Sequence, residues 1–258
     1  MSRRLAAVFA HPDDDTFGVG GCIALHIDRG LELLVIVATK GEAGMIADPS
    51  LATRESLGKV REEEERRSLE ALGAKDADLR FYDYPDGGLA DAPRDELIRK
   101  VEEDLAGFVP DVVVTFGPEG VTKHDDHIAI HQATTEAFHR AKDRADGGFQ
   151  RLLYAAIPQT EIERFQELQR MAGMEPFNPE DPFAPRGVPD ETIAIRVDCT
   201  SAVPKKVEAL RAHRTQAEEI EAIPEEAHEL VFGQEAFVQA WPPREPGDPV
   251  QSDLFEQL

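Results

Sequence analysis

The sequence predicts an α/β protein in which a mostly parallel sheet lies between two layers of helices, a three-layer α/β/α sandwich. Short runs rich in Val and Ile alternate along the chain with longer amphipathic stretches, which is the pattern of βα units around a parallel sheet. In addition, 41% of the 258 residues are hydrophobic, which is enough to bury a sizeable core.

The expected strands are apolar runs, because strands of a parallel sheet are buried on both faces. They are 5–10 (LAAVFA), 32–38 (ELLVIVA), 78–84, 111–116 (DVVVTF), 151–157 and 192–197. Helices are expected where apolar residues recur with a 3.6-residue period, and Gly30 and Gly73 stand where a helix would stop. These helices span 18–29, 54–72, 94–108 and 126–141, and a further one runs from 201 to about 219. The resulting sheet is Rossmann-like, with C-terminal additions.

The sequence predicts a single domain over 1–258, because no linker is long enough to separate two units. A core covers about 5–160, and a C-terminal elaboration covers about 161–241. The last residues, 242–258, are expected to form a tail. The Pro-rich excursion at 175–191 is expected to shape one wall of a substrate pocket, since long loops in compact domains are often functional.

The charge excludes some classes of partner. There are 28 Lys and Arg against 51 Asp and Glu, a formal net charge of -23 that repels nucleic acids and anionic membrane surfaces. The sequence shows neither a signal peptide nor the ~18 consecutive apolar residues of a membrane helix. With Cys22 and Cys199 as its only cysteines, the chain suits a reducing, cytoplasmic setting, and one bridge between them stays open. A small molecule is the expected ligand. Most acidic residues outside the motifs are expected to lie on the solvated surface.

Polar side chains follow the first expected strand directly. The sequence AHPDDD places His11, Asp13, Asp14 and Asp15 at its carboxyl end, where open α/β sheets bind ligands. Pro12 restricts this loop by fixing its own φ and by keeping His11 out of helical geometry. For Asp15, a structural interpretation as an acid at a helix N-terminus is as good as a functional one.

A second cluster follows the strand at 111–116. His124, Asp125, Asp126, His127 and His131 stand within eight residues there, and the last of them is expected to be a packing residue. Imidazole and carboxylate groups at two equivalent strand ends predict one shared site for zinc or another first-row divalent ion. A catalytic zinc site uses three protein ligands and keeps one position open for water.

Four segments together resemble the LmbE-like, or PIG-L, family of zinc-dependent N-deacetylases. They are AHPDDD, HDDH, TKGEAG at 39–44 and VREEEERRSLEALGA at 60–74. The resemblance extends over about 5–141, and KKVEALRAHRTQ at 205–216 is similar to the family's late helix. It implies a metal-dependent hydrolase that removes the N-acetyl group of an N-acetylglucosamine-type substrate and releases acetate and a free amine. The implied cofactor is Zn²⁺, with Fe²⁺ or another divalent ion as alternatives.

The resemblance also implies a role for individual residues, carried over position by position. The metal ligands would be His11, Asp14 and His127, and the general base would be Asp13. His124 would stabilise the oxyanion, and Asp126 would orient His124 and favour its charged form. The sugar would be contacted by Arg61 and Asp86.

The chain departs from the family pattern at three positions. Asp15 stands where members usually have Glu, Asp125 where they usually have Pro, and Thr122 where some have Tyr. Three other functions stay open: an amidase for a bulkier thiol-conjugate amide, a Mg²⁺-dependent phosphohydrolase, and a non-catalytic binding module. The phosphohydrolase is disfavoured because both polar clusters are rich in acids. The non-catalytic binding module is disfavoured because such a site would have no need of Asp13. Relatives often self-associate, so a homo-oligomer is also open.

Overall fold

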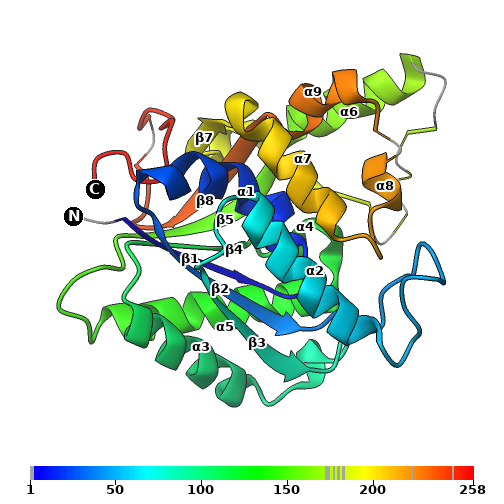
Figure 1. The fold of residues 1–258 in the computed structure, drawn as a ribbon. Helices are drawn as coiled ribbons and strands as arrows, with labels where there is room; N and C mark the ends of the chain where they lie inside the picture. Colours follow the sequence, from blue (N-terminus) through cyan, green and yellow to red (C-terminus); the bar gives the residue numbers. More distant parts are fainter. Residues whose placement is uncertain are drawn as a thin grey trace.

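The computed structural model describes residues 3–171, 175–176, 178, 181, 184–221, 223–245 and 247–258. A central sheet crosses the molecule, with helices packed on both of its faces (Figure 1). The strands are β1 (Arg4–Phe9), β2 (Glu32–Thr39), β3 (Asp78–Tyr84), β4 (Val112–Phe116), β5 (Arg151–Pro158), β6 (Gly187–Val188), β7 (Ile195–Asp198) and β8 (Gln234–Trp241). The α-helices are α1 (Asp14–His26), α2 (Leu57–Ala71), α3 (Arg94–Phe108), α4 (Gly120–Lys123), α5 (Asp125–Lys142), α6 (Gln159–Met171), α7 (Val203–Ala212), α8 (Glu218–Glu221) and α9 (His228–Phe232).

The strand order is β3-β2-β1-β4-β5-β8-β7, with β6 paired to β5. The strands from β3 to β5 are parallel, whereas β8 lies antiparallel between β5 and β7. The direction of winding reverses between β1 and β4. The crevice outside their carboxyl ends is therefore the place where such a sheet binds ligands.

Helices α1, α2 and α7 cover one face of the sheet, and α3 and α5 cover the other (Figure 1). Because both faces are covered, residues 5–10 of β1 and the turn after it are 0% exposed. This double coverage explains why the strands read as continuous apolar runs and not as alternating patterns. The predicted three-layer, mostly parallel fold is confirmed.

Several elements have no predicted counterpart, and α6 and β8 are the longest of them. Polar residues interrupt β8 (QEAFVQAW), so it is not an apolar run. Its buried Glu235 is neutralised by Lys206, whose Nζ donates to Oε1 at 2.7 Å, and its backbone pairs with β5 through Phe237 opposite Ala155. A strand that depends on such distant partners leaves a weak local signal.

The helix expected over 201–219 is shorter than predicted. Helix α7 ends at Ala212, and a turn follows in which Glu64 of α2 accepts hydrogen bonds from the Thr215 amide (2.9 Å) and hydroxyl (2.7 Å). A side chain from another helix thus captures backbone that would otherwise continue the helix.

The segment expected to be a tail, 242–258, packs its end against the domain. Leu254 is 0% and Phe255 4% exposed, and the Arg151 guanidinium donates to the Leu254 carbonyl oxygen (2.8 Å). Phe255 also meets the His26 ring edge to face, with centroids 5.2 Å apart. Leu254 and Phe255 therefore belong to the hydrophobic core.

We predict that Phe255→Ala lowers the free energy of unfolding by about 3–5 kcal/mol, because a buried aromatic side chain is lost and a cavity remains. Urea denaturation followed by circular dichroism measures this change. Val250→Ala, at a side chain that is 54% exposed, is the matched control and should change stability by less than about 0.5 kcal/mol. Equal effects of the two substitutions would show that the end of the chain contributes nothing to the core.

Other expectations concern smaller features. Of the Pro-rich excursion at 175–191, residues 177, 179–180 and 182–183 lie outside the described residues. Near the end of this segment, the Arg186 amide donates to the Val121 carbonyl oxygen of α4 (2.8 Å).

Cys22 and Cys199 are buried free thiols. Over the described ranges, no helix has the length and apolar character needed to cross a membrane.

Candidate metal centre

The turn after β1 brings the first polar cluster to the carboxyl edge of the sheet. Asp13 has a φ of 101°, a left-handed conformation that strains residues other than glycine. Two hydrogen bonds hold this turn: the Asp13 amide donates to Glu65 Oε2 (3.1 Å), and the His11 amide donates to Asp14 Oδ2 (2.7 Å). Helix α1 therefore begins at Asp14, earlier than predicted, with the Asp14 carboxylate directed back at His11.

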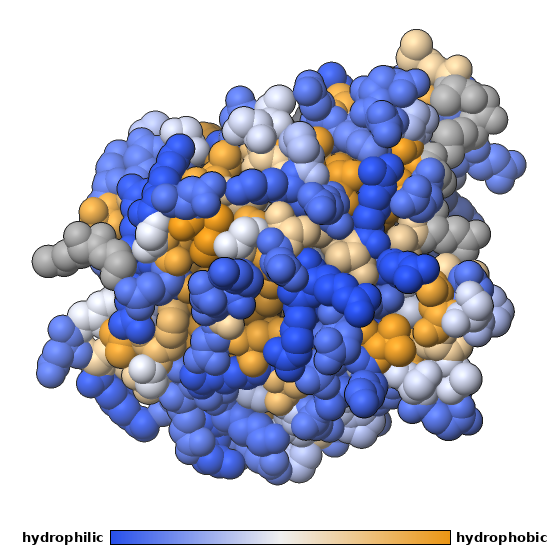
Figure 2. All heavy atoms as spheres, in the orientation of Figure 1, coloured by the Kyte–Doolittle hydropathy of each residue, from blue (hydrophilic) through white to orange (hydrophobic). Residues whose placement is uncertain are grey.

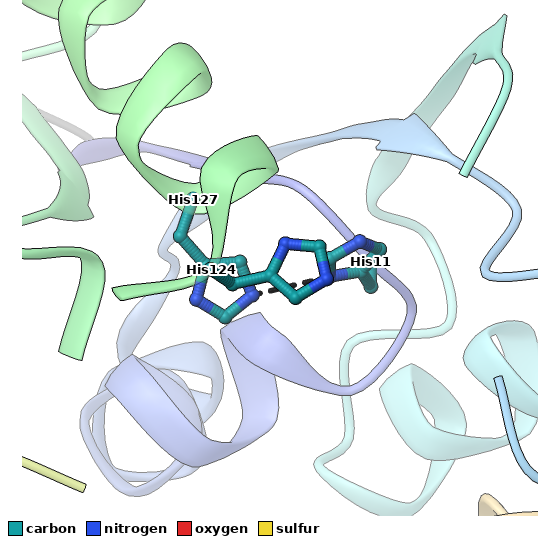
Figure 3. A group of neighbouring side chains, drawn as sticks. All are labelled: His11, His124 and His127. Carbon is teal, nitrogen blue, oxygen red and sulfur yellow. Dashed lines mark hydrogen bonds between the residues drawn. The ribbon is translucent and has the colours of Figure 1, made fainter. Parts of the chain in front are cut away.

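The three predicted metal ligands lie together. His11 Nδ1 is 3.1 Å from His127 Nε2 and 3.4 Å from Asp14 Oδ2, and His127 Nε2 is 3.5 Å from Asp14 Oδ1. Bonds of about 2.0–2.2 Å to zinc place the donor atoms of a tetrahedral site about 3.3–3.6 Å apart. The observed spacings match that geometry closely, so these side chains fit a metal ion. In Figure 3, a dashed line marks the hydrogen bond between the rings of His11 and His127, and His124 lies beside them.

The second ring nitrogen of His11 and of His127 is held by other groups of the protein. His127 Nδ1 lies 2.8 Å from the Gly120 carbonyl oxygen, and the ring stacks on Phe116 at 4.0 Å between centroids. His11 Nε2 faces Asp86 Oδ1 at 3.0 Å and Asp126 Oδ2 at 3.4 Å. These acceptors hold the ring protons and leave His127 Nε2 and His11 Nδ1 for a metal, an arrangement typical of metal-binding histidines.

The charges around His11 also fit a cation. Burial opposes a charge on His11, but hydrogen bonds to Asp126, Asp14 and Asp86 outweigh it and raise the pKa of His11 well above its usual value. Burial likewise opposes ionisation of Asp14, yet the nearby His127 and the hydrogen bonds from His11 lower the pKa of Asp14. The site thus stabilises positive charge at its centre, and a divalent ion meets the same demand.

Asp13 lies beside the three predicted ligands and is held by Arg61. The Arg61 guanidinium donates to Asp13 Oδ2 (3.1 Å), to the Pro12 carbonyl oxygen (2.7 Å) and to the Gly41 carbonyl oxygen (2.9 Å). Burial raises the pKa of Asp13 to about 7, against the opposing effect of Arg61. Arg61 is only 4% exposed, so the structure places it against Asp13 and the surrounding backbone.

His124 and Asp126 stand at the start of α5. The Asp126 amide donates to His124 Nδ1 at 3.2 Å, so His124 caps the helix with its ring. The Asp126 carboxylate is 0% exposed and accepts hydrogen bonds from the amides of Gly87 (2.8 Å) and Leu89 (2.9 Å). The structure thus brings both predicted residues to the site, with the Asp126 amide on His124 and its carboxylate beside His11.

Sequence reasoning missed several buried polar residues near the site. Glu65 is 0% exposed and supports the Asp13 amide, although the EEEE run that contains it reads as solvated charge. Its signal lies in the helical period, because Leu57, Arg61 and Glu65 are four residues apart and share one face of α2. Asp15, for which the sequence offered both a structural and a functional interpretation, lies in the first turn of α1 and is 0% exposed, and burial raises its pKa to about 7.

Comparison with known proteins agrees with this site. The family model of PIG-L, GlcNAc-PI de-N-acetylase, matches residues 6–138. The 1D-myo-inositol 2-acetamido-2-deoxy-alpha-D-glucopyranoside deacetylase of Kineococcus radiotolerans is 34% identical over 250 residues, covering 83% of this chain and 69% of the relative. The enzyme of the same name from Thermobifida fusca is 31% identical, covering 98% of this chain and 99% of its own.

A solved structure shares the fold. The N,N'-diacetylchitobiose deacetylase of Pyrococcus horikoshii superimposes with a TM-score of 0.62 and 22% identity, covering 92% of this chain and 84% of that one. The family match includes both polar clusters and the helix that carries Arg61. The chain therefore belongs to the PIG-L, or LmbE-like, family of N-deacetylases.

Proposed function

We propose that this protein removes the acetyl group from an N-acetylglucosamine-type substrate and releases acetate and a free amino sugar. The observation that carries this proposal is the close grouping of His11, Asp14 and His127. Asp13 directly precedes Asp14 in the chain, and His124 stands three residues before His127. A metal with a neighbouring acid and a neighbouring hydrogen-bond donor is the equipment that amide hydrolysis needs.

His11, Asp14 and His127 would hold the ion, with Zn²⁺ expected and Fe²⁺ or another divalent ion as alternatives. Such an ion polarises a carbonyl group and lowers the pKa of water to about 7, which makes a nucleophile available at neutral pH. Asp86 and Asp126 would orient His11 by accepting its Nε2 proton, as their positions 3.0 and 3.4 Å from that nitrogen suggest.

Asp13 would act as the general base. Its carboxylate accepts the proton of the attacking water and then passes it to the departing amine, so that one group serves both halves of the reaction. Arg61 would serve Asp13 by holding its carboxylate in place, in addition to any contact with the sugar.

His124 would stabilise the oxyanion as a hydrogen-bond donor. Because the Asp126 amide donates to Nδ1, this nitrogen has to act as acceptor, and the ring proton resides on Nε2. A neutral His124 can therefore donate from Nε2. A preorganised donor of this kind contributes roughly 2.7–4 kcal/mol of transition-state stabilisation.

The direct test is metal removal and restoration. We expect wild-type protein to release acetate and primary amine in equal amounts from N-acetylglucosamine derivatives. Chelation should abolish this release, and one equivalent of Zn²⁺ should restore it, because the site is expected to need its ion for activity. Buffer exchange without a chelator is the control. Amine release that survives complete metal removal, or its absence from every derivative in metal-loaded protein, would refute the proposal.

A further inference from the structure

Asp13 stands at the N-cap of α1, yet its side chain does not cap the helix. The Asp13 carbonyl oxygen accepts a hydrogen bond from the Phe17 amide (3.0 Å), but its carboxylate accepts none from the first turn, whose residues are all described. An aspartate at this position usually accepts such a bond from the second or third amide of the helix. Helix α1 therefore does not fix the Asp13 carboxylate, and groups elsewhere in the fold have to orient it.

The backbone of Asp13 also needs support from outside α1. Its φ of 101° is the largest positive φ of any non-glycine residue in the part of the chain that the structure describes. Such a conformation is unfavourable for a residue with a Cβ and persists only where the surroundings hold it. Asp13 lines a cavity of about 160 Å³, so protein atoms surround it on only part of its surface.

Helix α2 supplies the support through one of its faces. The Arg61 guanidinium donates to Asp13 Oδ2 (3.1 Å), and one turn further along, Glu65 Oε2 accepts from the Asp13 amide (3.1 Å). After them, the Ser68 and Thr16 hydroxyl groups share a hydrogen bond of 2.8 Å. Spacings of four and three residues place these three side chains of α2 on the same face. The helix thus holds the turn after β1 at successive points.

Glu65 makes the contact to the strained backbone itself. It is 0% exposed, and His213 Nε2 lies 3.8 Å from its Oε2, which is too long for a hydrogen bond. The outer face of α2 is hydrophilic (Figure 2), and Glu63 and Arg66 are exposed on the helix. Because burial of an acidic side chain is unfavourable unless it is hydrogen-bonded, the bond from the Asp13 amide accounts for the inward position of Glu65.

Resting on the deacetylase function above, we propose that Glu65 is a positioning residue for the general base. By accepting the Asp13 amide, it holds the left-handed φ and so keeps the Asp13 carboxylate against Arg61 and beside the predicted metal ligands. Without this acceptor the backbone of Asp13 relaxes, and the carboxylate moves away from the place where it has to meet the attacking water. A misplacement of about 1 Å can lower a rate about 10²-fold.

The first experiment compares two substitutions of similar length in metal-loaded protein. Glu65→Gln keeps an oxygen acceptor, whereas Glu65→Met removes it and still fills the space. We expect Glu65→Met to lower kcat for amine release about 10–100-fold, with KM and metal content unchanged. Glu65→Gln should stay within about threefold of wild-type kcat. Glu63→Met, on the exposed side of α2, is the matched control and should change neither constant.

Two outcomes of this comparison would overturn the assignment. Wild-type kcat in Glu65→Met would show that the acceptor is not needed. An equal loss in Glu65→Gln and Glu65→Met would show that Glu65 acts through its charge or its proton and not as an acceptor for the amide.

The second experiment is a double-mutant cycle, which separates a role through Asp13 from a general structural role. In Asp13→Asn no base is left to position, so the addition of Glu65→Met should lower the residual single-turnover rate by less than about twofold. The same factor in both backgrounds would contradict the proposal. Glu65→Ala takes the place of Glu65→Met in the cycle if circular dichroism shows that the methionine variant does not fold.

Crystal structures of zinc-loaded wild type and Glu65→Met separate this inference from the deacetylase function. If no derivative releases amine, the deacetylase function fails, and the two structures alone decide about Glu65. A φ of Asp13 that leaves the left-handed region in Glu65→Met, with loss of the hydrogen bond from Arg61, supports the positioning role. An unchanged φ and an unchanged contact with Arg61 overturn it.

Discussion

Asp13→Asn is expected to lower kcat for acetate release by about 10²–10⁴-fold while the metal content stays the same. Asparagine has the same size as aspartate and can still accept the hydrogen bond from Arg61, but it cannot take a proton from water. Asparagine also tolerates positive φ better than most residues, so it suits the φ of 101° at this position, where alanine would add strain. The measurement pairs single-turnover amine release with metal content by mass spectrometry.

Asp28→Asn is the control for this substitution, because the Asp28 side chain is 79% exposed and only pairs with Lys205 on the surface. It should leave both activity and metal content unchanged. An Asp13→Asn protein that retained its metal and stayed within tenfold of wild-type activity would show that another group moves the proton.

Asp14→Ala is expected to lose the bound metal and, with it, detectable amine release. His11 Nδ1 and His127 Nε2 lie 3.1 Å apart, and Asp14 approaches the first with Oδ2 (3.4 Å) and the second with Oδ1 (3.5 Å). Without Asp14 only the two histidines remain, and a catalytic zinc site needs three protein ligands. Asp86→Asn should have a smaller effect, about 10–100-fold in metal affinity, because Asp86 contacts the His11 ring and not the metal position. Competition of each protein with a chromophoric zinc chelator measures both affinities.

The site geometry predicts that Asp14→Ala weakens metal binding more than Asp86→Asn does. His139→Gln offers a control on α5 itself, because His139 meets Trp241 edge to face, away from the cluster, and its loss should spare the metal. His127→Gln should behave like Asp14→Ala. If Asp86→Asn removed the metal as completely as Asp14→Ala, the ion would be bound on the other side of His11, by Asp86 and Asp126.

Much of the central fold could be predicted because its signals are local. β1, β2 and β4 are buried on both faces, so their continuous apolar runs mark them as strands without any knowledge of their partners. β8 could not be found in this way, since its Glu235 is tolerated only because Lys206 of α7 neutralises it. The packed C-terminal end depends likewise on Arg151, more than a hundred residues earlier.

The candidate site could likewise be predicted only in part from the sequence. His11, Asp14 and His127 follow strands at the ligand-binding edge of the sheet, so motif and topology together place them in one crevice. The surroundings of each group were beyond sequence reasoning. Sequence reasoning gave Arg61 and Asp86 only as sugar contacts, which stays a prediction, and the structure adds that they lie against Asp13 and His11. Glu65 and His213 were not singled out, because their burial follows from how α2 and α7 pack.

The sequence by itself determined the fold class and the family, and it predicted which residues would hold a metal, because hydrophobic periodicity and short motifs act through neighbours along the chain. Only the tertiary structure decided which nitrogen of each histidine faces the metal position, which carboxylates orient the rings, and which cavity adjoins Asp13. Those features depend on distances between segments up to 200 residues apart, and such distances are set by packing of the whole core.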